Sequence, residues 1–287
     1  MPEIRIMDKW WHRITGMQGM RARIRIRPTR FVKTMRTLPL RTFDRLTDGR
    51  HAIIPDGHGA GLRFLGGNSR YDRIKGSSEK PVQDAIFEHL KPGAVFYDVG
   101  ANLGFFSVLA ARAVGPMGHV VAFEPIPANI EAIKRNLARN DFKNVTVVEA
   151  AASGKTGKER FRITRSHAGG VLSSSGVIPN DAKSEMEVRT QALDDGIESG
   201  IWPKPNLIKI DVEGSELEVL QGLDRTLQRH RPILVIEFDS GDLSELEKRR
   251  SVVRRLLEEY SYRISPLAPS YPNIAWHVCH DIAIPQQ

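Results

Sequence analysis

The sequence predicts an α/β fold, a doubly wound and mostly parallel sheet of the Rossmann-like type, with a β-insertion between the third and fourth core strands. Two observations carry this prediction. From residue 94 onwards, short apolar runs of strand length alternate with stretches in which apolar residues recur at helical spacing. The one interval that breaks the alternation, residues 151–205, contains strand-like segments and no strong amphipathic helix.

The elements follow from these patterns in order. Residues 51–75 are expected to form short strands and turns, and residues 79–90 a helix with Val82, Ile86 and Leu90 on one face. Strands are expected at residues 95–99, 119–123, 145–150, 206–212 and 233–238, with final strands at 262–265 and 277–284. The connecting helices are expected at residues 105–114, 128–140, 215–228 and 243–260.

The insertion contains two strand-like segments, KERFRIT at residues 158–164 and EMEVRTQAL at residues 185–193. Between them lies SHAGGVLSSSG, residues 166–176, which is expected to be a loop. Such a loop acts either as a lid over a binding site or as a simple surface turn, and the two readings have equal weight.

The composition is that of a soluble globular protein. The 287 residues are 40% hydrophobic and 26% charged, which is enough for one large domain or a domain with an extension. The single cysteine, Cys279, excludes an intrachain disulfide and a cysteine-based metal site, and it fits a reducing compartment. Residues 1–20 lack the apolar run of a secretory signal, so we expect a cytoplasmic protein.

The net charge of +8 is concentrated in residues 1–50, which contain 13 lysines and arginines against 4 acidic residues. We therefore expect a basic N-terminal extension, residues 1–50, and a main domain, residues 51–287. The densest part, RARIRIRPTR at residues 21–30, fits a solvated arm or an edge strand protected by charge. The alternative is electrostatic contact with an anionic membrane, a glycolipid or nucleic acid. Contact with a membrane or glycolipid would make the protein peripheral to the membrane.

The segment FYDVGANLGFFS, residues 96–107, places an acid and two glycines where the first core strand ends and a helix begins. In an open α/β sheet this is where ligands bind, and glycine lets the backbone come close to them. The pattern is DxGxxxG rather than the dinucleotide fingerprint GxGxxG, and no phosphate-binding GxxxxGK[ST] occurs. Because Asp98 would repel a phosphate, the pattern favours a ligand with an amine or a sulfonium group.

An acid also ends the next expected strand. Glu124 lies 20 residues after Gly104, at the position where a carboxylate binds both ribose hydroxyls of a nucleoside. Ala150 and Ala151, at the end of the third strand, leave room for a flat adenine. S-adenosylmethionine has this adenine, ribose and cationic group, and it has no pyrophosphate. The alternative is that Asp98 and Glu124 only stabilise helix N-termini.

Together, FYDVGANLGFFSVLAA, VVAFEPIPANIEAIKRN and LIKIDVEGSELEVLQG resemble the FkbM-type methyltransferases, as does RPILVIEF. The resemblance covers residues 51–285, has its motif core at residues 94–240, and is most specific at IDVEGSE. It implies a class I methyltransferase fold and S-adenosyl-L-methionine as cofactor. Many members of the family methylate hydroxyl oxygens of sugars or of secondary metabolites, so a small-molecule or glycan acceptor is expected.

The resemblance also implies which residues bind the cofactor. Asp98, Gly100, Asn102 and Gly104 would line its methionine and ribose side, and Glu124 would bind the ribose. The other expected contacts are Ala101, Phe105, Pro125, Ala150 and Ala151.

Acids at the ends of the fourth and fifth core strands are the candidates for the chemistry. Asp211 lies next to where the transferable methyl group is expected, so it is the first candidate for the base or for the group that orients the acceptor. Glu213 is the second candidate, and Glu237 is a further acid of the site. A divalent metal held by Asp211 and Glu213 is conceivable, but two acids do not establish one, and no metal is expected.

Two other residues, His167 and Glu79, have both a functional and a structural reading, and two more have a structural reading only. His167 is a third candidate for the base, and its structural reading is a solvated loop histidine. Glu79 either faces the site or stabilises the start of its helix. Ser215 and Glu218 have the spacing of a capping box, so both are expected to be structural.

Three other functions compete with this one. A nucleic-acid methyltransferase recruited by the basic extension is disfavoured, because no NPPY-like segment follows the fourth strand to hold a flipped base. An NAD-dependent oxidoreductase would need the missing GxGxxG. A non-catalytic protein that binds an adenosyl ligand would not need the acids that the sequence retains.

Overall fold

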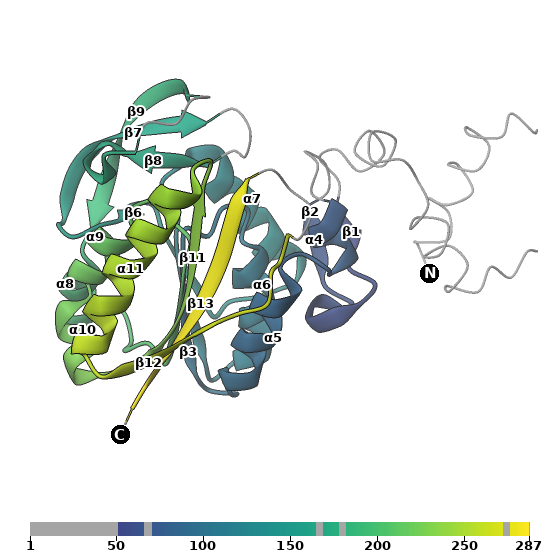
Figure 1. Ribbon diagram of the computed structural model, residues 1–287. Coiled ribbons are helices and arrows are strands. Elements are labelled where there is room, and N and C mark those ends of the chain that lie inside the picture. Colours follow the sequence, from purple (N-terminus) through teal and green to yellow (C-terminus); the bar gives the residue numbers. More distant parts are fainter. Residues whose placement is uncertain (1–50, 66–70, 165–168, 178–181, 272–275, 287) are drawn as a thin grey trace, which may run out of the picture. The chain divides into compact units, whose positions relative to one another are not determined.

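The computed structural model describes residues 51–65, 71–164, 169–177, 182–271 and 276–286. The expectations for the basic extension and for His167 concern residues outside these ranges. Within them the doubly wound α/β class is confirmed (Figure 1).

A seven-stranded sheet forms the centre of the fold. Its strands are β3 (Val95–Val99), β4 (His119–Phe123), β5 (Val145–Val148), β10 (Leu207–Ile210), β11 (Ile233–Ser240), β12 (Tyr262–Pro266) and β13 (His277–Pro285). Their order is β12-β13-β11-β10-β3-β4-β5, with β13 antiparallel to both of its neighbours and the other pairs parallel. Because the strand order reverses at β3 and β10, their carboxyl ends form the switch point at which such folds bind ligands.

Helices cover both faces of this sheet (Figure 1). On one face, Val82, Leu109 and Ile133 belong to one buried apolar cluster, and on the other, Leu223 and Leu257 belong to a second. The helices of the first face are α5 (Lys80–His89), α6 (Phe105–Val114) and α7 (Pro127–Arg139). Those of the second are α8 (Leu193–Glu198), α9 (Glu216–Gln221), α10 (Asp224–Arg229) and α11 (Leu243–Glu259). Two short strands, β1 (His51–Ile53) and β2 (Arg63–Leu65), and the helix α4 (Tyr71–Lys75) precede this core.

The expected β-insertion is confirmed as a separate four-stranded sheet, which we call the small sheet (Figure 1). Its strands are β6 (Ala151–Ala152), β7 (Gly157–Thr164), β8 (Gly170–Leu172) and β9 (Ala182–Gln191), in the order β6-β9-β7-β8. The expectation of a loop over residues 166–176 is wrong for part of that range. Val171 and Leu172 are buried and pair with β7, because burying their apolar side chains stabilises this pairing.

The single helix expected over residues 215–228 is also wrong, since α9 and α10 are separate. The carboxylate of Asp194 accepts the backbone N–H groups of Arg225 at 2.8 Å and Thr226 at 3.0 Å, which a continuous helix would use internally. At the break, a Cβ on Gly222 would lie 2.2 Å from the carbonyl oxygen of Ser153. The chain therefore stops one helix and begins another where it packs against the small sheet.

The capping box expected at Ser215 and Glu218 does not form, because Ser215 makes no side-chain cap hydrogen bond. The neighbouring Glu216 is buried instead. Its carboxylate accepts the N–H of Gly214 at 2.8 Å and lies 2.9 Å from the guanidinium of Arg249. This contact ties the turn after β10 to α11.

Gly100 allows the carboxyl ends of β3 and β10 to come together. Its φ is +82°, and a Cβ at this position would lie 1.8 Å from the carbonyl oxygen of Asp211. The glycine is thus required by the protein's own backbone and not only by the approach of a ligand. Gly104, with φ at +77°, plays a similar part, since its Cβ would lie 3.0 Å from the side chain of Ile133 in α7.

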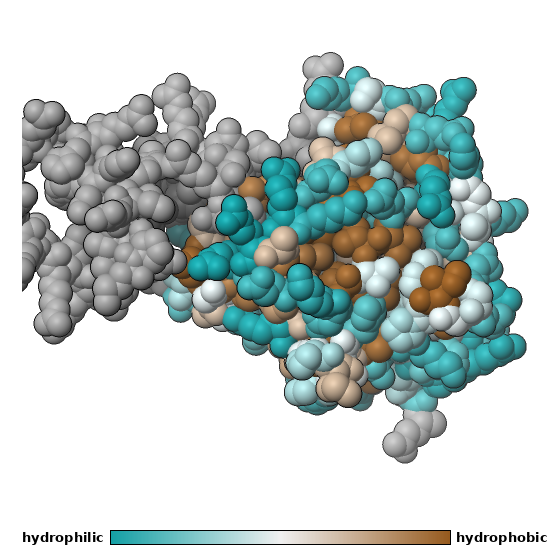
Figure 2. Space-filling model, turned by 180° about the vertical axis from the view of Figure 1, so that it is seen from behind, coloured by the Kyte–Doolittle hydropathy of each residue, from teal (hydrophilic) through white to brown (hydrophobic). Residues whose placement is uncertain are grey.

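Seen from behind, the described surface is mostly hydrophilic, with smaller apolar areas between the polar side chains (Figure 2). Within the described ranges, the large apolar residues that are exposed come from separate parts of the chain: Ile53, Met117, Ile201, Leu243 and Trp276. No helix within the described ranges has both the length and the apolar composition needed to cross a membrane.

We predict that Gly100→Ala destabilises the protein far more than Gly93→Ala. Both glycines have φ at +82°, but a Cβ on Gly93 would meet nothing within 4 Å. Gly93→Ala should therefore cost only the strain of the left-handed backbone, about 1–2 kcal/mol. Gly100→Ala adds a clash with backbone and should cost at least about 3 kcal/mol. Urea denaturation measures both, and equal losses would show that the approach of Asp211 to Gly100 is not as described.

Candidate functional site

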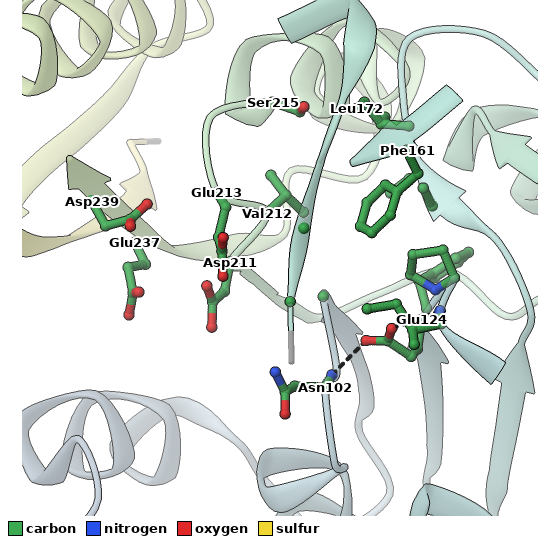
Figure 3. A pocket seen from close by; sticks show the side chains of 18 of the residues that line it. Asn102, Glu124, Phe161, Leu172, Asp211, Val212, Glu213, Ser215, Glu237 and Asp239 are labelled. Atoms are coloured by element: carbon green, nitrogen blue, oxygen red, sulfur yellow. Dashed lines mark hydrogen bonds between the residues drawn. The ribbon is translucent and has the colours of Figure 1, made fainter. Parts of the chain in front are cut away.

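A pocket of about 330 Å³ opens at the carboxyl ends of β3, β4, β10 and β11, and residues of the small sheet complete its wall. This volume is within the usual range for sites that bind cofactors and small molecules. The wall has two parts (Figure 3). Glu124, Phe161 and Leu172 lie on one side, which we call the insertion half. The other side, which we call the acidic half, is formed by Asp211, Glu213, Glu237 and Asp239.

Glu124 is the polar group of the insertion half. It follows β4 and is buried, with 4% of its surface exposed. One carboxylate oxygen, Oε2, accepts the backbone N–H of Asn102 at 2.8 Å. The other, Oε1, accepts the backbone N–H of Ile126 at 2.9 Å and the side-chain amide of Asn129 at 3.3 Å. These donors fix the carboxylate at the edge of the pocket while leaving it lone pairs for further hydrogen bonds.

The pKa of Glu124 is raised to about 7. Burial is the largest cause, because it removes the water that would stabilise the charge, and the three hydrogen bonds only partly offset it. Any ligand that donates hydrogen bonds to this carboxylate will favour its charged form and lower that pKa.

Apolar and small residues complete the insertion half. Ala151 and Ala152 of β6 line the pocket together with Ile126 and the ring of Phe161. A Cβ on Gly170 would lie 2.4 Å from a ring carbon of Phe161, so glycine at this position leaves space for the ring. A flat aromatic ring, small side chains and a carboxylate within one wall fit an adenine and a ribose, as S-adenosylmethionine requires.

Asn102 lies in the turn between β3 and α6, which closes the pocket beside Glu124. Its φ is +52°, in the left-handed region that asparagine tolerates better than most residues. Its side-chain oxygen accepts a hydrogen bond from Arg73 of α4 at 3.3 Å. The turn is thus held from two sides, by Glu124 at the backbone and by Arg73 at the side chain.

Asp98 lies behind the pocket wall. It is 1% exposed, and its Oδ2 accepts a hydrogen bond from the hydroxyl of Ser107 at 2.5 Å. Its Oδ1 has no hydrogen-bond partner among the described residues. Burial raises the pKa of this carboxyl, and the ammonium of Lys209 opposes that shift.

Lys209 is a buried cation that the sequence analysis did not identify. It lies opposite Asp98 in the pairing of β10 with β3, and only 3% of its side chain is exposed. Its Nζ lies 2.6 Å from Oδ2 of Asp211 and 4.8 Å from the centre of the Phe106 ring. Burial alone would lower the pKa of Lys209, but the charges of Asp211, Glu79 and other acids raise it, so the residue keeps its proton.

Glu237, in the second half of β11, belongs to a hydrogen-bonded network that extends behind the acidic half. His280 Nε2 of β13 lies 2.6 Å from Glu237 Oε2 and 4.0 Å from Oε2 of Glu79. The hydroxyl of Tyr271 donates to Glu79 Oε1 at 3.0 Å. His280 is 1% exposed, whereas 15% of the Glu237 side chain is exposed, so Glu237 is the member of that pair that reaches the pocket.

The pKa of Glu237 is raised to about 7, first by burial and then by the charge of Asp211. The pKa of His280 is also raised, because the nearby Glu237 outweighs the effect of burial. Glu79 lines the pocket and makes no cap hydrogen bond at the start of α5, which favours the reading of Glu79 as a site residue.

Glu79, Glu237 and His280 are also residue types that hold metal ions, and their ligand atoms lie within 4.8 Å of one another. Ligands about 2.1 Å from an octahedral ion are about 3 Å apart. The 2.6 Å contact between His280 and Glu237 is shorter, as expected for a hydrogen bond. A metal would have to separate these two side chains, and Lys209 already supplies one positive charge to the cluster.

The structure brings about half of the expected cofactor contacts to the pocket. Those that line it are Gly100, Asn102, Glu124, Pro125 and Ala151. The others are buried and do not line it: Asp98, Ala101, Gly104, Phe105 and Ala150. Asp211, Glu213 and Glu237, the acids expected to serve the chemistry, all line the pocket.

The sequence analysis missed three of the lining residues used above, Arg73, Phe161 and Asp239. It also missed Lys209, Tyr271, Trp276 and His280. Of these four, only Lys209 had a clear signal, since a lysine in the middle of the apolar strand LIKI is rarely buried without a charged partner. The other three lie near or within β13, far along the chain from the motifs, and only the sheet order brings them to the site.

The sequence model of one family, described as "Methyltransferase FkbM domain", matches residues 98–264. Among curated proteins, the hexuronic acid methyltransferase AglP of Haloferax volcanii is 30% identical over 163 residues, which are 57% of this chain and 63% of AglP. The 31-O-demethyl-FK506 methyltransferase FkbM of Streptomyces tacrolimicus is 32% identical over 55% of this chain and 70% of its own. The match therefore spans less than two thirds of AglP.

Among solved structures, the methyltransferase FkbM from Methylobacillus flagellatus is similar with a TM-score of 0.46 at 18% identity. The superposition covers 75% of this chain and 54% of the other. The matched family segment contains the ends of β3, β4, β10 and β11, at which the pocket lies.

We predict that Lys209→Met lowers the free energy of unfolding by about 3–5 kcal/mol, because it leaves buried carboxylates without their cation. The loss should be smaller at acid pH, where those carboxylates take up protons instead. Lys158→Met is the matched control, since Lys158 pairs with Glu187 at 2.8 Å on the open surface and its removal should have little effect. Equal stability of the two variants in chemical denaturation would contradict the proposed role of Lys209.

Proposed function

The chain belongs to the FkbM methyltransferase family and is an S-adenosylmethionine-dependent methyltransferase, and from this premise we propose that it methylates a hydroxyl oxygen of a sugar or a secondary metabolite. The observation that carries the proposal is the acidic half of the pocket. It places carboxylates from β10 and β11 opposite a wall that fits an adenosine. Hydroxyl groups are donors that carboxylates bind well, and they must lose a proton when they are methylated.

The insertion half is proposed to hold the cofactor. Glu124 would accept hydrogen bonds from the ribose hydroxyls, and Phe161 with Ala151 would enclose the adenine. The turn at Gly100 and Asn102 would border the methionine part. When bound there, S-adenosylmethionine supplies a methyl group on a positively charged sulfur. The protein's contribution is to hold the acceptor in line with that methyl group, which accounts for about 7–11 kcal/mol of the barrier in well-oriented reactions.

Glu237 is proposed to accept the proton of the hydroxyl. Asp211, the first candidate from the sequence, lies 2.6 Å from the ammonium of Lys209, so this ion pair already engages one of its carboxylate oxygens. Glu237 reaches the pocket, and its raised pKa is close to the value that suits a base at neutral pH. His280 behind it orients the carboxylate. Asp211 and Glu213 are proposed to orient the acceptor.

The names of two relatives support an acceptor of this kind. AglP is named for a hexuronic acid, and FkbM of Streptomyces tacrolimicus for the 31-O position of FK506. Contact of the basic extension with an anionic membrane or glycolipid remains a prediction, as does a cytoplasmic location. Methylation of a nucleic acid recruited by residues 1–50 remains the competing function.

The function is tested by incubating the full chain with methyl-labelled S-adenosylmethionine and sets of sugars, glycolipids and hydroxylated metabolites. The expected product carries the label as an O-methyl group, identified by mass spectrometry and NMR. RNA and DNA serve as the competing acceptors. Labelling of nucleic acid or of nitrogen or carbon, or no labelled product at all, would reject the proposal.

We predict that the protein releases protons when it binds S-adenosylhomocysteine below about pH 7. In the free protein Glu124 has a pKa of about 7, and ribose hydroxyls would favour its charged form, so part of the population must lose a proton on binding. Affinity should therefore increase as pH rises towards 7 and then level off. Calorimetry in two buffers of different ionisation enthalpy measures the released protons.

The matched variants for this experiment are Glu124→Gln and Glu237→Gln, since both glutamates have raised pKa values in the same pocket. Only Glu124→Gln should abolish the release. Release that survives in Glu124→Gln, or that disappears in Glu237→Gln, would remove Glu124 from its proposed place at the ribose.

We predict that Glu237→Gln lowers kcat by about 10²–10⁴-fold, the usual contribution of a general base, with little effect on the affinity for S-adenosylhomocysteine. In the unmodified protein kcat should rise with pH through about 7, because only the charged Glu237 accepts a proton. The variant should lose this dependence. The exposed Glu131→Gln is the control for a lost negative charge, and an unchanged kcat in Glu237→Gln would contradict the assignment.

A further inference from the structure

The described wall of the acidic half has an excess of negative charge. Beside Asp211, Glu213, Glu237 and Asp239, Glu79 also lines the pocket. Arg73 is the one lysine or arginine among the described lining residues, and its guanidinium donates a hydrogen bond to the side-chain oxygen of Asn102. Lys209 is committed to Asp211 beneath the wall. The described lining of this half therefore contains more carboxylates than lysines and arginines.

Trp276 adds a flat apolar surface to the same half. It lines the pocket and is 49% exposed. Its indole N–H donates to Oδ2 of Asp239 at 2.7 Å, which fixes the ring. A Cβ on Gly241 would lie 2.8 Å from the ring, so one part of the tryptophan ring packs directly against that turn. The rest of the ring is not covered by Gly241. A fixed aromatic ring beside hydrogen-bonding carboxylates suits a ligand that has both an apolar face and polar edges.

Glu79 supplies an independent sign that a ligand binds here. The residue is 5% exposed and lines the pocket, and its Oε1 is taken by the hydroxyl of Tyr271. Its Oε2 has no hydrogen-bond partner among the described residues. A buried carboxylate oxygen without a donor is costly, so this atom calls for a donor group from outside the chain.

We propose that the acidic half is a sugar subsite that selects its acceptor by charge: it binds an uncharged sugar ring, binds an amino sugar more tightly, and rejects a sugar acid. This inference rests on the proposed function and names the class of acceptor for the same pocket. The ring would lie on Trp276 with its hydroxyl or ammonium donors directed to the carboxylates. Lys209 is paired with Asp211, and Arg73 is the one lysine or arginine in the described lining, so the five carboxylates that line the acidic half outnumber these two cations.

The physical basis is the sign of the charges and not their number alone. Hydroxyl and ammonium groups donate to carboxylates, whereas a carboxylate on the ligand can only accept and would be repelled. At the separations within one small pocket, a single like charge costs enough to weaken binding by at least about tenfold. Selection by repulsion needs no added contact with the favoured ligand. AglP is named for a hexuronic acid, so this chain would differ from that relative in the acceptor it takes.

The test uses the full chain saturated with S-adenosylhomocysteine and three probes of one shape: methyl glucoside, methyl glucosaminide in its protonated form, and methyl glucuronide. Dissociation constants are measured by ligand-observed NMR at low and high salt. We expect the glucosaminide to bind most tightly, the glucoside next, and the glucuronide at least about tenfold more weakly than the glucoside. High salt should reduce these differences, because it screens charge.

Two variants separate charge from shape. Asp239→Asn keeps an acceptor for the indole N–H of Trp276 but removes one negative charge. It should therefore reduce the difference between the dissociation constants of the glucoside and the glucuronide, which we call the gap. Glu131→Gln makes the same change on the exposed surface of α7 and should leave the gap unchanged. Trp276→Leu should weaken the binding of all three probes by a similar factor.

Glucuronide that binds as tightly as the glucoside, an equal gap in Asp239→Asn and Glu131→Gln, or failure of all three probes to bind would overturn the inference. The experiment measures binding and needs no methyl transfer, so its result is independent of the proposed function. A product methylated at nitrogen or carbon would reject the proposed function without contradicting the selection of acceptors by charge. Efficient O-methylation of a sugar acid would agree with the proposed function and reject the selection by charge.

Discussion

Everything at this site depends on one buried ammonium group among carboxylates. In a doubly wound sheet the carboxyl ends of neighbouring parallel strands meet at one edge, so acids placed at those ends are forced close together. Asp98, Asp211 and Glu237 come from three adjacent strands in this way. Lys209 extends from the middle strand beneath them, is 3% exposed and lies 2.6 Å from Asp211. Without a cation at this depth, the repulsion between the acids would oppose the pairing of β10 with β3 on one side and β11 on the other.

The same strand ends divide the pocket. Because the carbonyl oxygen of Asp211 occupies the space where a Cβ of Gly100 would be, β3 and β10 approach closely and leave ligands the space to either side. On the side of β4, Glu124 and the small sheet form a wall with one carboxylate among apolar groups. On the side of β11, the wall consists mainly of carboxylates, backed by His280 and Tyr271. A cofactor with an adenosine and an acceptor with several hydroxyl groups need these two different environments.

Much of this was readable in the sequence, and the failures have physical reasons. The alternation of strand and helix patterns predicted the core elements, and acids after strand-like runs predicted Asp211, Glu124 and Glu237 as site residues. Both features are local in the sequence. The break between α9 and α10 was not local, since Asp194, 31 residues away, takes the N–H of Arg225. The burial of Asp98 behind the wall depends on Ser107 and Lys209, and the motif alone did not reveal it. His280 and Tyr271 reach the site only because β13 lies beside β11.

The central claim is that the two halves of the pocket have separate occupants, the cofactor on the side of Glu124 and the acceptor on the side of Glu237. A crystal structure of the full chain with S-adenosylhomocysteine tests it most directly. The account predicts that both ribose hydroxyls lie within hydrogen-bonding distance of the Glu124 carboxylate, and that the sulfur faces Asp211 and Glu237. An adenosine placed against Glu237, Asp239 and Trp276, or a ribose without contact to Glu124, would contradict it.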